Sequence, residues 1–206
     1  VAKPTEWKTL DGKYVTPIKH NTIKEAKSWV EQYKNQSNLI YGNSMYPYSY
    51  IADEYPKTVQ YDIDQISIFT IDIEVQCENG FPNPQAAEEP FLSITIKNHQ
   101  SKKFVVWGIG EFRNDREDVT YIQCESEIHL LKEFLSFWEN HQPDVITGWN
   151  TEFFDIPYLC NRIHKLFGED EVKRLSPWRS VQSREMFQMG RKHQLYDIQG
   201  IAHLDY

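Results

Sequence analysis

Residues 66–75, with the sequence ISIFTIDIEV, constrain the fold of this chain more than any other segment. The run is rich in β-branched and aromatic residues and is too short for a helix of this hydrophobicity, so it predicts a central strand. Alternate side chains of a strand point to opposite faces. Asp72 and Glu74 therefore share one face, while Ile71 and Ile73 share the other.

Two explanations fit this pair of acids. Ionised carboxylates about 7 Å apart along a strand repel each other unless a cation or a proton lies between them. Carboxylates of this kind bind hard divalent ions such as Mg²⁺. Alternatively, Asp72 and Glu74 are solvated acids at an exposed strand end, because the pattern Asp-x-Glu arises by chance in many proteins.

The segments after this strand predict a mixed α/β fold. Extended runs at 91–96, 104–109 and 121–124 suggest an antiparallel meander. A helix capped by Ser126 is expected to reach about residue 140, and a short strand at 144–150 precedes a second helix that starts near Asp155 and stops at Gly168. The order strands, helix, strand, helix predicts a mixed sheet flanked by helices.

The first 64 residues form a different, partial α+β segment. Thr22 and Glu25 have the spacing of a capping box, and apolar residues recur at helical intervals after them, so a helix is predicted at about 22–35. The tract at 38–56 contains Gly, Pro and several tyrosines without sustained periodicity. It is expected to be a loop with short extended pieces.

The composition excludes disordered, collagen-like and low-complexity proteins. It does not decide whether the chain binds nucleic acid. A net charge of −8 argues at first sight against a nucleic-acid partner. The acidity is concentrated, however, because residues 61–160 contain 18 acidic and six basic groups. No apolar run approaches the roughly 20 residues that cross a bilayer, so no membrane association is expected. Three widely spaced cysteines fit a reducing, intracellular setting.

Asp155 stands just before Ile156 and Pro157 and also has two interpretations. An Asp at this position commonly caps a helix by accepting backbone N–H bonds. It could instead direct an oxygen toward a neighbouring strand end, because the strand at 144–150 brings the chain to that region.

Taken together, FTIDIEV and, about eighty residues later, ITGWNTEFFDIPYL resemble the first two exonuclease motifs of the family B DNA polymerases. The likeness is strongest to the replicative polymerases of T-even-type phages, and IDIEVQCENGFPNP and the closing IAHLDY share it. The resemblance implies a ribonuclease H-like 3′ to 5′ proofreading exonuclease domain at 65–206, preceded by part of the polymerase N-terminal domain at 1–64.

The resemblance also implies a two-metal site that hydrolyses the terminal phosphodiester of the primer with Mg²⁺ or Mn²⁺. Asp72 would bridge both ions, Glu74 would hold the ion that activates water, and Asp155 would support the second ion. Phe81 would wedge against the terminal bases; alternatively it packs under its own turn. Asn150 and Phe154 would lie on the substrate side, or serve as a turn former and a core aromatic.

Residues 180–201 correspond by this resemblance to a β-hairpin that helps to separate the primer strand. Arg184, Arg191 and Lys192 would contact backbone phosphates there, or would be ordinary solvated charges. The implied partners are the single-stranded 3′ end of primer DNA, the rest of the polymerase chain and, through it, a sliding clamp. The implied location is the cytoplasm of an infected host cell.

One part of the family pattern is missing from this sequence. The third exonuclease motif, Y-x-x-x-D, supplies a further metal-binding carboxylate, and no tyrosine here is followed four positions later by Asp. Because the chain also starts at Val1 and stops at Tyr206, it is expected to be a piece of a longer polymerase with little or no nuclease activity alone. A noncatalytic nucleic-acid binding module and a stand-alone DEDD-type exonuclease are the alternatives.

Overall fold

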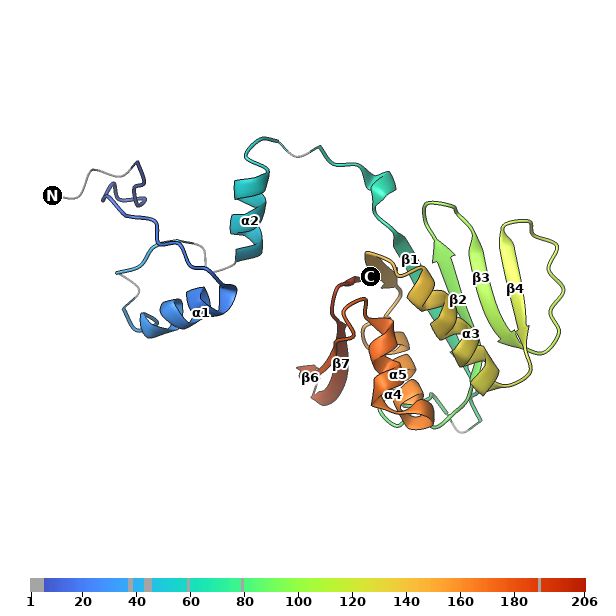
Figure 1. Ribbon diagram of the computed structural model, residues 1–206. Coiled ribbons are helices and arrows are strands. Elements are labelled where there is room, and N and C mark those ends of the chain that lie inside the picture. Colours follow the sequence, from blue (N-terminus) through green and yellow to red (C-terminus); the bar gives the residue numbers. More distant parts are fainter. Residues whose placement is uncertain (1–5, 37–38, 43–45, 59, 79, 189) are drawn as a thin grey trace. The chain divides into compact units, whose positions relative to one another are not determined.

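The computed structural model describes residues 6–36, 39–42, 46–58, 60–78, 80–188 and 190–206 (Figure 1). Contacts within the chain divide it into two units, Val1–Tyr61 and Asp62–Tyr206. The two units are described separately below.

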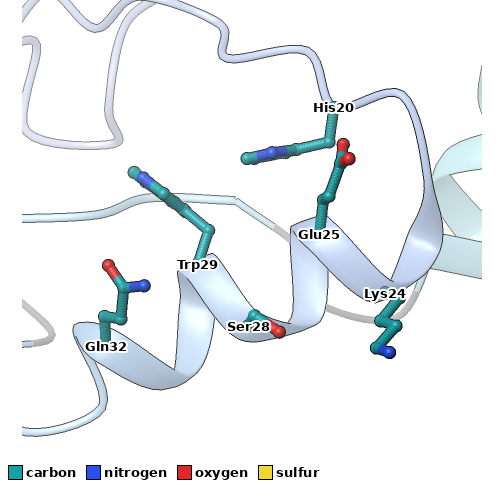
Figure 2. A pocket seen from close by; sticks show the side chains of 6 residues that line it. All are labelled: His20, Lys24, Glu25, Ser28, Trp29 and Gln32. Carbon is teal, nitrogen blue, oxygen red and sulfur yellow. The ribbon is translucent and has the colours of Figure 1, made fainter.

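The first unit contains two helices in its described residues, α1 (Ile23–Gln32) and α2 (Tyr46–Glu54). Thr22 caps α1 as predicted, because its side chain accepts the N–H of Glu25, while the Glu25 carboxylate accepts the N–H of Asn21. The rings of His20 and Trp29 lie 5.6 Å apart beside a shallow hollow along α1 (Figure 2).

The prediction of a loop at 38–56 is wrong where α2 forms. Pro47 falls in the first turn of this helix, where an N–H has no partner within the helix and its loss costs little. Proline and the scattered tyrosines concealed the helix from a periodicity argument. Residues 37–38 and 43–45 of this tract lie outside the described residues.

The second unit is built on a six-stranded sheet in the order β4-β3-β2-β1-β5-β8. A short 3₁₀ turn, η1 (Ile63–Gln65), leads into it. The strands are β1 (Ile68–Val75), β2 (Phe91–Asn98), β3 (Phe104–Ile109), β4 (Val119–Cys124), β5 (Val145–Gly148) and β8 (Ala202–Asp205). The strand predicted at 66–75 is therefore central in the sheet.

The direction of the strands corrects one sequence prediction. β1 and β2, and β2 and β3, pair antiparallel as a meander would, but β3 and β4 pair in parallel from Phe104↔Val119 to Ile109↔Cys124. The connection at 110–118 carries the chain back along the sheet, with Gly110 at a positive φ of 96°. β5 is parallel to both β1 and β8, so the sheet is mixed.

Two long helices cover the apolar face of the sheet. α3 (Glu127–Asn140) starts at the predicted Ser126 cap and packs against β2, β3 and β4, and α4 (Asp155–Phe167) packs against β1. Two short turns, α5 (Glu169–Val172) and η2 (Lys173–Leu175), follow α4. The largest fully buried side chains of this core are aromatic: Trp107, Trp138, Tyr158, Phe69, Phe91 and Phe134.

A separate two-stranded ribbon lies next to α4 (Figure 1). β6 (Val181–Gln188) and β7 (Arg191–Ile198) pair antiparallel, so the hairpin expected within 180–201 is present. The chain continues from it into β8, which was not predicted. No helix in the described part of the chain is long and apolar enough to cross a membrane.

Candidate active site

The carboxyl half of β1 carries the first two acids of the site. Phe69, Ile71 and Ile73 are buried, whereas Asp72 and Glu74 are exposed on the other side of the strand. The alternation predicted from the sequence is thus present. Although Asp72 is exposed as a residue, partial desolvation of its carboxyl group raises its pKa above the ordinary value.

Asp155 reaches this strand through a gap in the sheet. The parallel pairing of β5 with β1 covers only Ile68–Thr70, and β5 ends at Gly148. Further along β1, the N–H of Ile73 donates to Oδ1 of Asp155 at 3.0 Å. A carboxylate from α4 therefore takes the place of a strand carbonyl, between Asp72 and Glu74 in sequence.

Gly148 makes this end of the sheet possible. A Cβ added there would meet the Ile71 carbonyl oxygen at 2.8 Å and Thr151 Cγ2 at 2.4 Å. Only glycine lets the chain turn away from β1 at this close distance. The turn then places Thr151 and α4 beside the carboxyl half of β1.

The environment of Asp155 disfavours its charged form. Asp155 is only 5% exposed. Burial is the largest of the effects that raise its pKa to about 7. The negative charges of Asp72 and Asp205 add to this effect, while the bond from the Ile73 N–H opposes it. An ionised Asp155 thus has two acidic neighbours, and the backbone N–H groups of Ile73 and of Asp155 itself favour its charge.

The helix-capping interpretation of Asp155 is wrong. Phe154 occupies the cap position of α4, and Asp155 is the first helical residue. The Asp155 carboxylate instead accepts an N–H that lies 82 residues earlier in the chain. Of the two interpretations, the one that directs an oxygen to a strand end is confirmed.

β8 adds an acid that the sequence argument missed. Asp205 lies opposite Gly148, and its Oδ1 and Oδ2 accept the N–H groups of Thr151 and Glu152 at 3.1 and 3.2 Å. His203 on the same strand bonds the Thr151 hydroxyl at 2.9 Å, and burial lowers the pKa of this histidine. The edge strand therefore holds the turn that leads into α4. The closing segment IAHLDY was the available signal, because Asp205 ends a short β-prone run.

Two aromatic residues predicted to contact substrate lie together. Phe81 is 82% exposed, and its ring centroid is 4.9 Å from that of Phe154, which is partly buried against the core. Phe81 therefore does not pack under its own turn. Asn150 is exposed and adopts a φ of 56°, a left-handed conformation that asparagine tolerates better than most residues, and its carbonyl accepts the N–H groups of Phe153 and Phe154. The role of these three residues toward substrate stays a prediction.

Two of the three basic residues predicted to contact DNA are paired with acids of the same chain. Arg184 contacts Glu152 at 2.6 Å and Asp197 at 3.3 Å, and Lys192 contacts Glu185 at 2.6 Å. The side chain of Arg191 lies outside the described part of the structure. A contact of any of the three with phosphate stays a prediction.

The acids fit a divalent cation by chemistry. Asp72, Glu74 and Asp155 offer only oxygen donors, the type that Mg²⁺ and Mn²⁺ bind. The mutual repulsion of Asp72 and Asp155 is also of the kind that a cation relieves. Within the described residues, however, no three acidic, histidine or cysteine side chains are gathered closely enough to form a complete cation site.

Comparison with known proteins identifies the family. Residues 4–206 match the family described as DNA polymerase family B, exonuclease domain. This chain belongs to that family. The mixed sheet with its flanking helices is the ribonuclease H-like fold expected of such an exonuclease domain, so the fold predicted through the resemblance is confirmed.

The relatives of this family B exonuclease domain include phage, viral and archaeal polymerases. It is 29% identical to the DNA-directed DNA polymerase of Escherichia phage RB69 over 100% of this chain and 26% of the relative. It is also 29% identical to that of Enterobacteria phage T4 over 98% of this chain and 25% of the relative. A DNA polymerase of Pyrococcus glycovorans is 28% identical over 50% of this chain and 12% of its own length. The chain thus spans about a quarter of the phage polymerases, and the predicted likeness to that group is confirmed.

Proposed function

We propose that this chain is the 3′ to 5′ proofreading exonuclease portion of a phage-type DNA polymerase and that it acts on the single-stranded 3′ end of primer DNA. The observation that carries the proposal is the Asp155 carboxylate on the Ile73 N–H, beside the strand that bears Asp72 and Glu74. A buried carboxylate from α4 is thus fixed to the strand that bears the other two acids, and acids of a merely solvated strand end would not require such a contact.

In this proposal Asp72, Glu74 and Asp155 hold two divalent ions, Mg²⁺ or Mn²⁺. When bound, such ions activate water and stabilise the charge that develops on a phosphodiester during hydrolysis. The contribution of the chain is to fix the carboxylates: Ile73 holds Asp155, and Asp205 and His203 hold the turn before it. Phe81 and Phe154 offer aromatic faces that stack on any base, which suits an enzyme that must remove all four nucleotides.

A manganese titration tests the metal site directly. Mn²⁺ is followed by its electron paramagnetic resonance signal with the wild-type chain and with the Asp72→Ala variant. The Asp115→Ala variant, at an exposed acid of the connection 110–118, is the control. We expect Asp72→Ala to weaken Mn²⁺ binding at least tenfold and Asp115→Ala to leave it unchanged. Identical weak binding in all three proteins would remove the metal site and favour the noncatalytic binding module.

A binding measurement tests the substrate. A fluorescent single-stranded oligonucleotide in Ca²⁺ is expected to bind the wild-type chain and to bind the Phe81→Ala variant about five- to 150-fold more weakly, because one base–aromatic stack contributes about 1–3 kcal/mol. Equal affinity for both proteins would contradict the role given to Phe81.

Without a Y-x-x-x-D sequence, we expect the chain as printed to hydrolyse DNA very slowly. Rapid digestion of single-stranded DNA that Asp72→Ala abolishes would contradict this expectation. As part of a polymerase, the chain would contact the rest of the polymerase and, through it, a sliding clamp. It would act in the cytoplasm of an infected cell.

A further inference from the structure

Side chains on one face of α4 hydrogen-bond to the main chain of the loop between β1 and β2. Tyr158, Asn161, Arg162 and Lys165 have the spacing i, i+3, i+4, i+7 that places side chains on one helix face. Each of them donates to carbonyl oxygens of residues 84–89: Asn161 to Pro84 at 2.8 Å, Lys165 to Ala86 at 3.4 Å, Arg162 to Ala87 at 3.0 Å and Glu88 at 2.8 Å, and Tyr158 to Glu89 at 2.7 Å.

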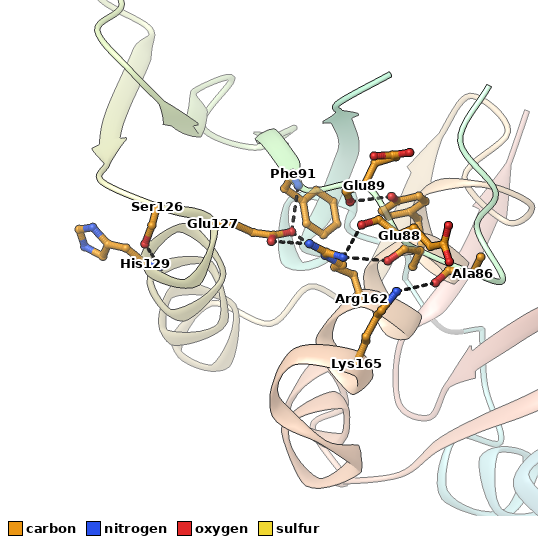
Figure 3. A network of polar contacts seen from close by, with 11 residues as sticks. Ala86, Glu88, Glu89, Phe91, Ser126, Glu127, His129, Arg162 and Lys165 are labelled. Atoms are coloured by element: carbon orange, nitrogen blue, oxygen red, sulfur yellow. Dashed lines mark hydrogen bonds and ion pairs between the residues drawn. The ribbon is translucent and has the colours of Figure 1, made fainter. Parts of the chain in front are cut away.

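This face is anchored by a buried ion pair (Figure 3). Arg162 makes two hydrogen bonds to Glu127 of α3, at 2.8 and 2.7 Å, and the Glu127 carboxylate also accepts the N–H of Phe91 at 2.9 Å. The side chains of Arg162 and Glu127 are only 10% and 12% exposed. The loop that carries Phe81 is therefore held at its later half by α3 and α4 together.

Asn161 differs from the other three residues of this face because both ends of its amide are used. Its Nδ2 donates to the Pro84 carbonyl at 2.8 Å, and its Oδ1 accepts the hydroxyl of Tyr196 at 2.5 Å. Tyr196 belongs to β7 and packs against the core, and Gln194 donates to its hydroxyl at 3.0 Å. One side chain thus joins the hairpin to the β1–β2 loop.

The hairpin also packs Val181 and Ile198 against the core and contacts the turn between β5 and α4. Arg184 reaches Glu152, and the ring of His193 lies 5.3 Å from that of Phe153, so both contact the turn between β5 and α4. A movement of the hairpin that breaks the Tyr196 bond would remove one of the two described hydrogen bonds that fix the Asn161 amide. The amide could then rotate more easily, and rotation would take its donor away from the Pro84 carbonyl.

We propose that Asn161 is a positioning residue that couples the hairpin β6–β7 to the loop carrying Phe81. The hairpin and the aromatic pair Phe81–Phe154 are then held in one arrangement through the same helix that begins with Asp155. The role of this coupling in handling the primer strand rests on the proposed function.

Amide hydrogen exchange of the whole chain, without DNA or metal, tests the coupling. The reporters are the amides of Gln85, Ala86 and Ala87, which are bonded to Asn83 within the loop. Tyr196→Phe removes only the Tyr196 hydroxyl, which is not bonded to any of these three amides. We expect it to speed their exchange about fivefold, as for the loss of roughly one hydrogen bond, and to leave the β2–β3 amides unchanged.

Two matched variants separate the coupling from general loosening. Arg184→Gln breaks the ion pair that joins the hairpin to Glu152 and should leave exchange at 85–87 unchanged. Asn161→Asp keeps the acceptor for Tyr196 but loses the donor to Pro84, so it should speed exchange at 85–87 without affecting the β7 amides. The coupling would be overturned if loop exchange stayed unchanged in Tyr196→Phe. It would also be overturned if Arg184→Gln accelerated exchange at 85–87 equally, or if Tyr196→Phe accelerated exchange over the whole sheet.

The outcome does not depend on the exonuclease assignment. If the oligonucleotide and Mn²⁺ titrations fail while Tyr196→Phe still speeds exchange at 85–87, the coupling stands and the proposed function falls. If those titrations succeed and loop exchange stays unchanged, the proposed function stands and the coupling falls.

Discussion

At the scale of single residues, the site depends on one carboxylate with two roles. Asp155 completes the hydrogen bonding of β1 and also adds negative charge next to Asp72. The first role is fulfilled by any side chain with an oxygen at that position, and the second requires ionisation. The two roles can therefore be separated by a substitution of the same shape.

The Asp155→Asn substitution is expected to stabilise the metal-free protein at high pH. Because the pKa of Asp155 is raised from 3.8 to about 7 in the folded state, this group favours folding fully below about pH 4, and that contribution is lost as the pH rises through 7. The variant should exceed the wild type in free energy of unfolding by up to about 4 kcal/mol at pH 8 and should match it near pH 4. Urea unfolding across this range gives the difference.

Asp115→Asn, at an exposed acid, is the control and should show no such pH-dependent gain. Adding Mg²⁺ at pH 8 should raise the stability of the wild type more than that of Asp155→Asn, since only the wild type keeps all three acids. A constant difference between wild type and Asp155→Asn from pH 4 to 8 would contradict the assigned shift.

At the scale of elements, the strength of the site lies in the contacts that fix β1, α4 and β8 to one another. Arg162 and Glu127 form a charge pair that is almost entirely removed from water, and Asp205 satisfies two N–H groups of the turn before α4. Removing one partner of a buried pair leaves the other charge without compensation, which costs much more than breaking a surface pair.

Glu127→Gln is expected to lower the free energy of unfolding by about 3 kcal/mol, because it keeps an oxygen for the Phe91 N–H but leaves the Arg162 charge buried. Glu169→Gln, which breaks the exposed pair with Lys173, should cost less than about 0.5 kcal/mol. Urea unfolding of the two variants gives the comparison, and equal losses would show that burial does not control the strength of the pair.

Asp205→Ala should destabilise the second unit by about 1 kcal/mol, the usual cost of removing a capping carboxylate. It should also lower the pKa of Asp155, because one of the negative charges that raise that pKa is gone. Carboxyl-carbon NMR titration of Asp155 measures the second effect. An unchanged Asp155 titration would mean that Asp205 acts on the turn alone.

The sequence was informative about single elements and less so about their pairing. The alternation around Asp72 and Glu74, the Ser126 cap and the glycine stop at Gly168 are local signals, and each appears in the structure. The parallel pairing of β3 with β4 depends on the path of a connection, and the role of Asp205 depends on contacts 53 and 54 residues away in sequence. Such long-range contacts leave no periodic pattern in the sequence.

At the scale of the whole molecule, nearly all of the described core belongs to the second unit. The buried hydrophobic residues run from Phe69 to Ile201, and α1 of the first unit has no buried residue. The described residues from Tyr55 to Gln65 are exposed. The described core of the second unit is thus built from residues of that unit.

Limited proteolysis is expected to cut the chain between residues 55 and 62 and to leave a resistant fragment of the second unit. The thermal midpoint of a protein containing only residues 62–206 should lie within a few degrees of that of the whole chain. Mass spectrometry identifies the cuts and calorimetry gives the midpoints. A much lower midpoint for the shorter protein would show that the first unit stabilises the second.

The gap in the sheet beyond Gly148 has a consequence for self-association. Where β1 continues without β5, an Ile73 N–H without a partner would leave a strand edge of the kind that pairs with a strand from another molecule, which is how edge-to-edge aggregation starts. Asp155 occupies the Ile73 N–H on that edge, and Asp72 and Glu74 place charges beside it. The same acids should thus keep neighbouring copies of the protein apart.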